Sequence, residues 1–596
     1  MKYFHLALIP ALLFPALSLA VTLHVPSQYA TIQAGINAAQ TYDTVLVAAG
    51  TYYEHIDLLG KQIWVRSASG PEATTIDGGL SDGYVVTFSG GESPESVLEG
   101  FTITHGYGLN PPGGGIFCDT LSGPTIKGNH IVSNGGQWNW FGAAISAWHA
   151  APHIEDNLIQ GNTCAYYGAG IYLNGCFDVT IYDNIISQNL TTSGYGVAVG
   201  GGIYCLNTEL SIQGNLFVEN EADVGYGYGG AIAVDGSGVC DMRHNTFSGN
   251  LSGLYNQSTG GGICLGPQGY NGSFNFMDNI LVNSTQGGGL SLYAGSPILR
   301  IDFNNIWGNA PSNYYGCSPG PFDISADPQF APYGYVPTAN SPCVDAGSFI
   351  WNPDPDGTRA DMGAFPYDRE GMNVTFQPYV WPISIPASGG WFAGHFFLTN
   401  NTSAPSNFDF WVDVLLPDSS VFGPVILRQD LAFSPAQQIM RAVVQNVPSG
   451  APAGNYLYRV HTGLYQTGQI FCEMAMPFTK LGVGGSDGKW TIQGDLEDWG
   501  RAPEMRPALP ETIRLEVSPN PFNPGTTLHF GLPTAGHVSL KIYDLSGRTV
   551  ATLLDRPLEA GIHAAVFNAE NLASGIYLAV VDWGDQRAMQ RLVLMK

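Results

Sequence analysis

The sequence predicts an all-β protein, in which a stacked β-solenoid is followed by two β-sandwiches. One phrase recurs seven times between Gly113 and Asn309, at intervals of roughly 26 to 34 residues. It consists of a glycine cluster, an aliphatic residue, a short variable stretch, an asparagine and an apolar pair. No amphipathic helical stretch interrupts these repeats. After them, alternating segments separated by Pro, Ser and Gly are typical of sandwich strands.

Composition limits the class of protein. The chain has 596 residues, a length that suggests about three to five domains. Asp and Glu (48) outnumber Lys and Arg (22), and the net charge of -26 repels nucleic acids and anionic membranes. We therefore expect no nucleic-acid partner. Charged residues make up only 12% of the chain and glycine reaches 77 residues, which suits β-structure held by backbone ladders.

Residues 1–20 have the pattern of an export signal peptide. Lys2 precedes an apolar run from Leu6 to Leu17, and Ser18-Leu19-Ala20 forms a small-x-small cleavage site. No other stretch approaches the about 18 uninterrupted apolar residues of a membrane-spanning helix. We expect no transmembrane segment in the mature chain.

Nine cysteines fit an exported chain, because an oxidising compartment permits disulfides. Cys317 and Cys343 flank a loop-rich segment and are the pair that we expect to form one. Cys118 and Cys205 occupy equivalent strand positions three coils apart, about 14 Å by the coil spacing, so we expect both to be buried thiols.

The solenoid should begin with a helix that covers its open end. Ile32, Ile36 and Ala39 lie on one face of a short helix. Such a helix would shield the core and the strand edges of the first coil, which have no preceding coil to pack against. Three short strands follow, within residues 43–54, 63–67 and 75–79.

Stacking explains why the phrase repeats, since a single coil has nothing against which to bury its apolar face. Neighbouring coils lie about 4.8 Å apart, so equivalent residues align in rows along the solenoid. We expect the row that contains Ile116, Ile145 and Ile171 to face the interior, and the residues one position later to point outward.

An asparagine closes each phrase before the apolar pair. Asparagine tolerates the left-handed backbone conformation of a sharp corner, and its amide can bond the asparagine of the next coil. We therefore predict a structural ladder formed by Asn129, Asn157, Asn184, Asn215, Asn245, Asn279 and Asn305.

The opening segment from Tyr29 to Gly79 resembles that of secreted right-handed parallel β-helix proteins of the pectate-lyase-like superfamily. The segment 327–365 is similar to the closing segment common in bacterial β-helix surface proteins. The resemblance implies a right-handed parallel β-helix over residues 21–370, with an N-terminal helix cap. It implies no single function, because the superfamily includes lyases, hydrolases, esterases, epimerases and non-catalytic binding proteins.

Three further regions follow the β-helix. Residues 372–481 contain alternating aromatic and aliphatic segments and predict a β-sandwich. Residues 482–510, rich in Gly, Asp, Pro and Glu, favour a flexible linker. Residues 511–596 carry Ser518-Pro-Asn-Pro-Phe-Asn-Pro and Leu572-Ala-Ser-Gly-Ile-Tyr-Leu.

This last block resembles the C-terminal sorting domain of type IX secretion cargo, and is similar to the immunoglobulin-like fold of flagellar hook-capping proteins. The resemblance implies two immunoglobulin-like sandwiches in all. It also implies recognition by outer-membrane secretion machinery, and a secreted or cell-surface location in a Gram-negative-type bacterium. The alternative is an ordinary β-sandwich with no sorting role.

Aromatic residues suggest a ligand-binding surface on the outside of the coils. Flat rings along a shallow groove suit the apolar faces of sugar rings, although the same residues could simply pack loops against the barrel. The candidates in the loops before the glycine clusters, and on the adjoining strands, are Trp138, Trp140, Tyr166, Tyr167, Tyr172, Tyr195, Tyr204, Tyr226 and Tyr228.

Acidic residues give two candidate reactive sites. Asp156 and Asp183 precede ladder asparagines in adjacent coils, and His244 holds the same place two coils after Asp183. The carboxylates could share a calcium ion or act as an acid and a nucleophile, but Asp-Asn is also common at turns. The outward residues Asp119, Trp148 and Asp235 lie on the strand face that carries catalytic groups in the resembled superfamily. The arginine or lysine base of its lyases is missing there.

A further acidic cluster lies in the closing segment. Asp354, Asp356 and Asp361 have a spacing that could hold calcium together with backbone carbonyls, but the Glu that completes an EF-hand loop is absent. A structural turn is the alternative.

Together these features predict a secreted or cell-surface β-helix protein that binds polysaccharide. A polysaccharide lyase or glycoside hydrolase is one alternative, and a non-catalytic adhesin or envelope component is another.

Overall fold

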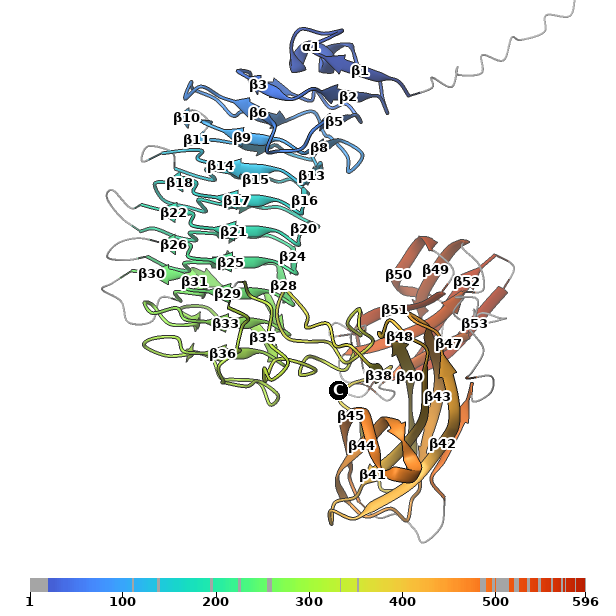
Figure 1. Cartoon of the computed structure of the whole chain (residues 1–596). Helices are drawn as coiled ribbons and strands as arrows, with labels where there is room; N and C mark the ends of the chain where they lie inside the picture. The colour runs from blue at the N-terminus through green and yellow to red at the C-terminus, as the bar shows by residue number, and fades with distance from the viewer. Residues whose placement is uncertain are drawn as a thin grey trace, which may run out of the picture. The chain divides into compact units, whose positions relative to one another are not determined.

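The computed structural model describes residues 20–594 except 110–111, 137–139, 193–196, 223–226, 254–259, 333, 351–352, 483–488, 496–498, 500–513, 519–521, 523–524, 533–535, 545–547, 559–560, 570–571, 574 and 585. The chain divides into two compact units (Figure 1). The first comprises residues 1–348 with 360–368, and the second 349–359 with 369–596. The predicted export signal lies outside the described residues except for Ala20.

The first unit is a parallel β-solenoid (Figure 1). Each full coil contributes one strand to each of three walls, which we call sheets A, B and C. Sheet A consists, in spatial order, of β1 (Thr22–Val25), β2 (Thr44–Val47), β5 (Trp64–Ser67), β8 (Val97–Glu99), β13 (Thr125–Lys127), β16 (His153–Glu155), β20 (Val179–Tyr182), β24 (Leu210–Gln213), β28 (Val239–Arg243), β32 (Ser273–Met277) and β35 (Ile298–Asp302).

Sheet B follows sheet A along each coil. Its strands are β3 (Gly50–Tyr52), β6 (Thr74–Asp77), β9 (Thr102–Thr104), β14 (His130–Val132), β17 (Leu158–Gln160), β21 (Ile185–Ser187), β25 (Leu216–Val218), β29 (Thr246–Ser248), β33 (Ile280–Val282) and β36 (Asn305–Trp307).

Sheet C completes the coil. Its strands are β4 (Ile56–Asp57), β7 (Val86–Phe88), β12 (Ile116–Cys118), β15 (Ile145–Trp148), β19 (Ile171–Asn174), β23 (Ile203–Leu206), β27 (Ile232–Gly236), β31 (Ile263–Tyr270), β34 (Leu290–Leu292) and β37 (Tyr314–Tyr315).

Shorter strands lie in the connections between sheets B and C. They are the hairpin of β10 (Gly108–Leu109) and β11 (Pro112–Gly113), and a parallel sheet of β18 (Thr163–Cys164), β22 (Leu190–Thr191), β26 (Glu221–Ala222) and β30 (Leu251–Ser252).

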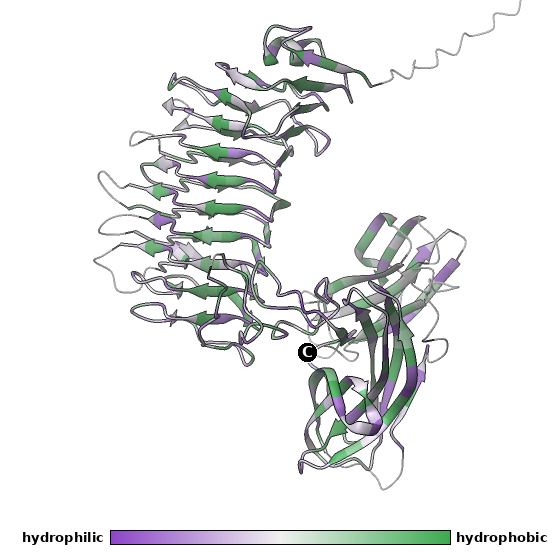
Figure 2. Cartoon of the chain, viewed as in Figure 1, coloured by the Kyte–Doolittle hydropathy of each residue, from purple (hydrophilic) through white to green (hydrophobic). Residues whose placement is uncertain are grey.

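The interior of the solenoid is built from aligned apolar rows, as predicted. Ile116 pairs with Ile145 and Ile145 with Ile171, and all three are fully buried. Hydrophobic colour runs along the strands of the stacked coils (Figure 2). Because each residue of a row touches its equivalents in the coils on either side, the core is continuous from the first coils to the last.

The asparagine row forms a buried ladder. Asn184 shows the pattern: its Oδ1 accepts from Asn157 Nδ2 (3.0 Å), and its Nδ2 donates to Asn215 Oδ1 (3.0 Å). The same amide also donates to the backbone oxygens of Ile154 (2.9 Å) and Tyr182 (2.8 Å). Each asparagine therefore ties three coils together.

Two details of the ladder differ from the prediction. Its last asparagine is Asn304, which accepts from Asn279, whereas Asn305 opens β36 and bonds Ala326 and Cys343. The left-handed backbone conformation belongs to the residue before each asparagine, with φ +55° at Asp183.

A second ladder follows five residues later in each coil and was not predicted. Asn189 Oδ1 accepts from Asn162, and Asn189 Nδ2 donates to Asn220 (2.9 Å). The recurrence was present in the sequence as a second asparagine at fixed spacing. The fully connected members are Asn134, Asn162, Asn189, Asn220 and Asn250.

The predicted helix cap is confirmed as α1 (Ile32–Ala38). Thr31 caps its N-terminus by accepting from Ala34 N, and Ile32 and Ile36 are fully buried against the first coil. At the other end, Lys61 Nζ donates to the backbone oxygens of Ile36, Asn37 and Ala39. This cation offsets the negative end of the helix.

The expected disulfide between Cys317 and Cys343 is not formed, and all nine cysteines are free thiols. Cys317 Sγ contacts the backbone oxygen of Leu290, and Cys343 Sγ accepts from Asn305 Nδ2. Cys118 and Cys205 are buried thiols of the core, as predicted.

The second unit is built from β-sandwiches. In the middle sandwich, a sheet of β38 (Met372–Pro378), β40 (Gly390–Asn400), β43 (Gln438–Val447) and β46 (Thr491–Gly494) packs on a sheet of β39 (Ser384–Ile385), β45 (Gln469–Lys480), β44 (Gly454–Leu464), β41 (Ser406–Leu415) and β42 (Val421–Phe433). A 3-10 helix, η1 (Tyr465–Thr467), joins β44 to β45.

Part of the predicted linker 482–510 belongs to this sandwich. β46 pairs with β43, and Trp499 is buried beside Phe410, with ring centroids 4.6 Å apart. The described part of the predicted spacer therefore includes an edge strand and a core residue of the sandwich.

The C-terminal sandwich combines two antiparallel sheets around its own core, which includes Leu528, Leu540 and Val581. No helix among the described residues is long and apolar enough to cross a membrane. The strands of the two sheets are β47 (Arg514–Ser518), β48 (Gly525–Leu532) and β51 (Gly561–Asn568), and β50 (Thr549–Leu558), β49 (Gly536–Tyr543), β52 (Gly575–Trp583) and β53 (Gln586–Leu594).

Candidate functional site

A recurrent glycine turn shapes the outer face of sheet C. At Gly200, φ is +67° and an added Cβ would lie 2.3 Å from the backbone oxygen of Ile203. Only glycine fits a positive φ combined with so close an approach. The turn directs the preceding loop back over the strand that follows it. The glycines that share this geometry are Gly142, Gly168, Gly200, Gly229 and Gly260.

The folded-back loops stack as a column of their own. Backbone bridges connect Phe141 to Tyr167, Tyr167 to Val199 and Val199 to Tyr228. This column covers the outward residues of the strands beneath: the ring centroids of Phe141 and Tyr172 are 4.9 Å apart. Those of Tyr167 and Tyr204 are 5.0 Å apart.

The covering loops remove part of the predicted aromatic platform. Tyr172, Tyr204 and Tyr228 are 3%, 2% and 8% exposed, so they pack the loops and do not meet solvent. They do point away from the coil interior, since they belong to a hydrophobic cluster separate from the main core. Alternation correctly predicted the direction of Tyr172 and Tyr204, but not the loops that cover them.

Several rings remain accessible at the rim of this cluster. Trp140 is 54% exposed and stands edge-on to Tyr166, with centroids 5.9 Å apart at 87°. Tyr166, Tyr167 and Trp148 are half-buried, and Trp148 Nε1 donates to Ser146 Oγ (3.2 Å). The predicted platform residues Trp138, Tyr195 and Tyr226 lie outside the described residues.

The aromatic surface continues toward the N-terminal coils. Tyr84 and Phe117 stack with centroids 4.6 Å apart and planes 13° apart. Asp119 follows β12 and is half-buried, and its carboxylate accepts from Thr120 N (2.7 Å). We call the half-buried and exposed residues of this surface, Phe117, Trp140, Trp148, Tyr166 and Tyr167, the aromatic face.

Asp235, expected to be an exposed outward acid, is 1% exposed. Its Oδ1 accepts from the backbone nitrogens of Gln268 (2.7 Å) and Gly269 (3.1 Å), and Tyr204 donates to its Oδ2 (3.0 Å). Burial raises the pKa of this carboxyl, although the three donors oppose that shift. Asp235 therefore holds a loop in place. Gln268 was not among the predicted site residues. The insertion after Leu265, relative to the other coils, was the feature of the sequence that could have indicated it.

Asp156 and Asp183 lie at the corner between sheets A and B, on a different part of the coil from the aromatic face. Both have a positive φ, +56° and +55°, which is the geometry of the turn alternative. Lys127 lies 3.3 Å from Asp156 and 2.8 Å from Glu155. Partial burial, and then the charge of Asp156, raise the pKa of Asp183. The two carboxylates interact electrostatically between equivalent turns of adjacent coils.

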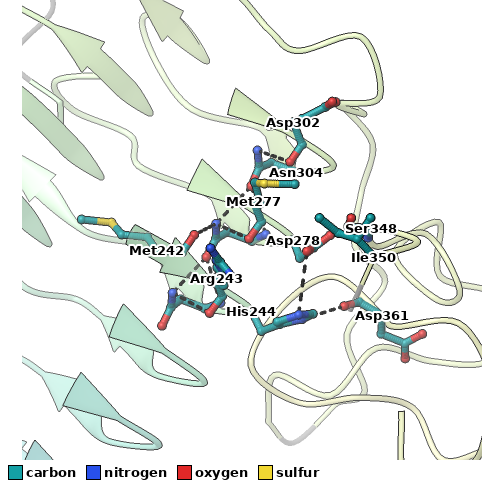
Figure 3. Close-up of polar contacts among 12 residues, drawn as sticks. Met242, Arg243, His244, Met277, Asp278, Asp302, Asn304, Ser348, Ile350 and Asp361 are labelled. Atoms are coloured by element: carbon teal, nitrogen blue, oxygen red, sulfur yellow. Dashed lines mark hydrogen bonds and ion pairs between the residues drawn. The ribbon is translucent and has the colours of Figure 1, made fainter. Parts of the chain in front are cut away.

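His244 lies two coils beyond Asp183, so the three predicted catalytic residues do not form one site. Its ring lies between the backbone oxygen of Asp361, 3.2 Å from Nδ1, and Asp278 Oδ2, 3.8 Å from Nε2 (Figure 3). Asp278 Oδ1 also accepts from Ser348 N. His244 and Asp278 thus hold the closing segment of the first unit against the coils.

Acid should weaken this contact. Burial lowers the pKa of His244 to about 4, so the unfolded chain binds a proton between about pH 6.5 and pH 4 that the folded chain does not. The solenoid should therefore lose up to about 3 kcal/mol of stability from this group as the pH falls through that range. We expect His244→Gln to reduce the difference between urea midpoints at pH 7 and pH 4.5.

The exposed His149 provides the control. His149→Gln removes an imidazole outside this contact, and the pH dependence of its urea midpoint would be compared with that of His244→Gln. Equal pH dependence in wild type and His244→Gln would contradict the assignment.

Two of the three residues predicted to bind calcium accept hydrogen bonds from the backbone. Asp356 accepts from Thr358 N (2.8 Å) and Arg369 N (2.9 Å), and Asp361 accepts from the backbone nitrogens of Asp345 and Tyr367. Asp354 belongs to the turn that Thr358 closes, with its N–H donating to the Thr358 carbonyl. Within the described ranges, no group of three or more His, Cys, Asp or Glu residues could hold a metal ion.

Comparison with known protein families agrees with this architecture. Residues 72–251 match the family model described as "Right handed beta helix region", and residues 516–595 match "Secretion system C-terminal sorting domain". The chain is a secreted or cell-surface β-helix protein. The sorting domain assigns its export to type IX secretion.

Two individual proteins are also similar to this β-helix protein. The probable autotransporter YfaL of Escherichia coli K12 is 25% identical over 195 residues, which cover 28% of this chain and 15% of YfaL. The crystal structure of red sea bream transglutaminase aligns at 10% identity over 38% of this chain and 32% of its own. Its TM-score of 0.14 is too low to indicate a common fold.

Proposed function

We propose that the protein binds a neutral polysaccharide on the aromatic face of sheet C. The observation that supports this is Trp140, which is largely exposed yet is held edge-on by Tyr166. Exposed rings that are held by neighbouring side chains offer flat apolar surfaces to sugar rings, and binding then costs little side-chain entropy. Asn174 pairs with Trp148 on the neighbouring strand, and Asp119 follows Phe117 by two residues, so both can bond hydroxyl groups.

Charge favours a neutral ligand. The outward residues on β12, β15, β19, β23 and β27, and those just after them, include no Lys or Arg. The whole chain carries a net charge of -26. A uronic-acid polymer would meet repulsion with no compensating cation, whereas a neutral sugar chain would not.

The geometry favours binding over cleavage. Asp119 and Asp235 are four coils apart, about 19 Å by the coil spacing, whereas the paired carboxylates of glycosidases lie about 5 to 9.5 Å apart. Asp235 is also buried, so it cannot reach a substrate. The face likewise lacks the lysine or arginine base expected of a lyase.

Replacing Trp140 with alanine should lower the affinity for a neutral glycan about five- to thirtyfold, because a stacked indole contributes about 1 to 2 kcal/mol. Affinity would be measured by calorimetry on the full chain, with ligands first identified on a glycan array. Tyr53→Ala is the matched control, since Tyr53 is 76% exposed elsewhere on the solenoid.

Unchanged affinity in the Trp140→Ala variant would remove the aromatic face from the binding site. Failure to bind any glycan, together with specific capture of a protein partner, would favour the adhesin alternative.

A further inference from the structure

Residues 266–269 interrupt the regular pairing of sheet C. β27 and β31 are in register from Ile232–Ile263 to Val234–Leu265, and pairing resumes at Gly236–Tyr270. One residue of β27, Asp235, therefore lies opposite four residues of β31, Gly266–Gly269. The three additional residues form a bulge.

The bulge lies over the outer face and is fixed there by its last two residues. The backbone nitrogens of Gln268 and Gly269 donate to buried Asp235, which also accepts from Tyr204. The exposed side chain of Gln268 extends further, and its Nε2 donates to the Tyr167 hydroxyl (3.3 Å). Tyr167 comes from a loop three coils earlier, about 14 Å along the solenoid.

This connection closes one end of the aromatic face. On the N-terminal side of Gln268 the surface continues from Tyr167 through Phe141 to Trp148, and Phe117 lies on the strand one coil before Trp148. At Gln268 it meets a polar side chain and the peptide bonds of the bulge. A sugar chain lying along the sheet could extend freely toward the first coils but would stop at the bulge.

We propose that the aromatic face recognises the end of a neutral polysaccharide chain and not its interior, with Gln268 contacting the terminal sugar. This inference rests on the proposed function. The amide of Gln268 can bond a hydroxyl that only a terminal sugar presents, while Tyr167 and Trp148 stack on the sugars that follow. Each polysaccharide chain would then bind one protein per matching end, whatever its length.

The test is the binding ratio of the full chain to fragments of increasing length. Linear β-1,3-glucan, β-1,4-xylan, β-1,4-mannan and α-1,6-glucan would each be size-fractionated and titrated by calorimetry. We expect a constant ratio of one protein per glycan chain. A ratio that rises with length would overturn end recognition while leaving polysaccharide binding intact. No binding to any glycan would overturn both.

A loop variant provides a second test. Replacing residues 266–269 with a single serine would leave one residue opposite Asp235, as in regular pairing. Several molecules of this variant should bind to each long glycan fragment. A folded variant, judged by circular dichroism, that retained a ratio of one would overturn the role of the bulge. If the variant did not fold, the wild-type length series would still decide the question.

Discussion

Asn184→Ala should lower the free energy of unfolding of the solenoid by about 4 kcal/mol. The Asn184 side chain is buried, accepts from Asn157 and donates to Ile154, Tyr182 and Asn215. Its removal would leave several buried polar groups in adjacent coils without partners, at about 1 to 3 kcal/mol each. Urea unfolding, followed by circular dichroism, would measure the change.

Two variants test whether the amide is responsible. Asn184→Asp keeps the shape and the acceptor but loses the Nδ2 donor and buries a charge, so it should be nearly as damaging. Asn37→Ala removes an exposed asparagine that makes one side-chain contact with Gln33, and it should change stability by less than about 0.5 kcal/mol. Tolerance of Asn184→Ala would mean that the ladder contributes little.

Gly200→Ala should be a similarly severe change. The new Cβ would lie 2.3 Å from the Ile203 carbonyl oxygen while φ remains +67°. A left-handed alanine alone costs about 1 to 2 kcal/mol, and the contact must be relieved by moving the loop off sheet C. We expect a total loss of about 4 kcal/mol and increased solvent exposure of Tyr204, measured by urea unfolding and fluorescence quenching.

Gly161→Ala is the matched control for the contact. Gly161 has nearly the same φ, +64°, but nothing lies within 4 Å of an added Cβ. Its substitution should therefore cost only the left-handed backbone term, about 1 to 2 kcal/mol. Equal losses at the two positions would show that backbone conformation, and not close approach, sets the requirement for glycine.

The repeated phrase was sufficient to predict the solenoid because every coil must bury its apolar face against its neighbours. The rows that start at Ile116 and Asn129 follow directly from equal spacing. The prediction failed at Asn305 because Asn304 and Asn305 are adjacent, and the glycine or polar residue that usually precedes the ladder asparagine is replaced by Phe303. Only the backbone, with φ +56° at Phe303, decides between them.

The candidate site was less predictable because it depends on what covers each residue. Strand alternation correctly predicted that Tyr172 and Tyr204 point outward, but loops from the adjoining connections bury them. Asp235 was misjudged for the same reason, since its partner is the backbone of Gln268 in the next coil. The recurrent glycines mark where the loops turn, but they do not show which side chains the loops cover.

The sulfur chemistry of the solenoid matters for a chain that leaves the cell. Its buried thiols are protected by their surroundings, and burial raises the pKa of Cys164 to about 12 and that of Cys343 to about 11, which suppresses the reactive thiolate. The coils are held together by backbone hydrogen bonds between strands, amide ladders and apolar contact. No disulfide joins the described coils, so a reducing habitat would leave them intact.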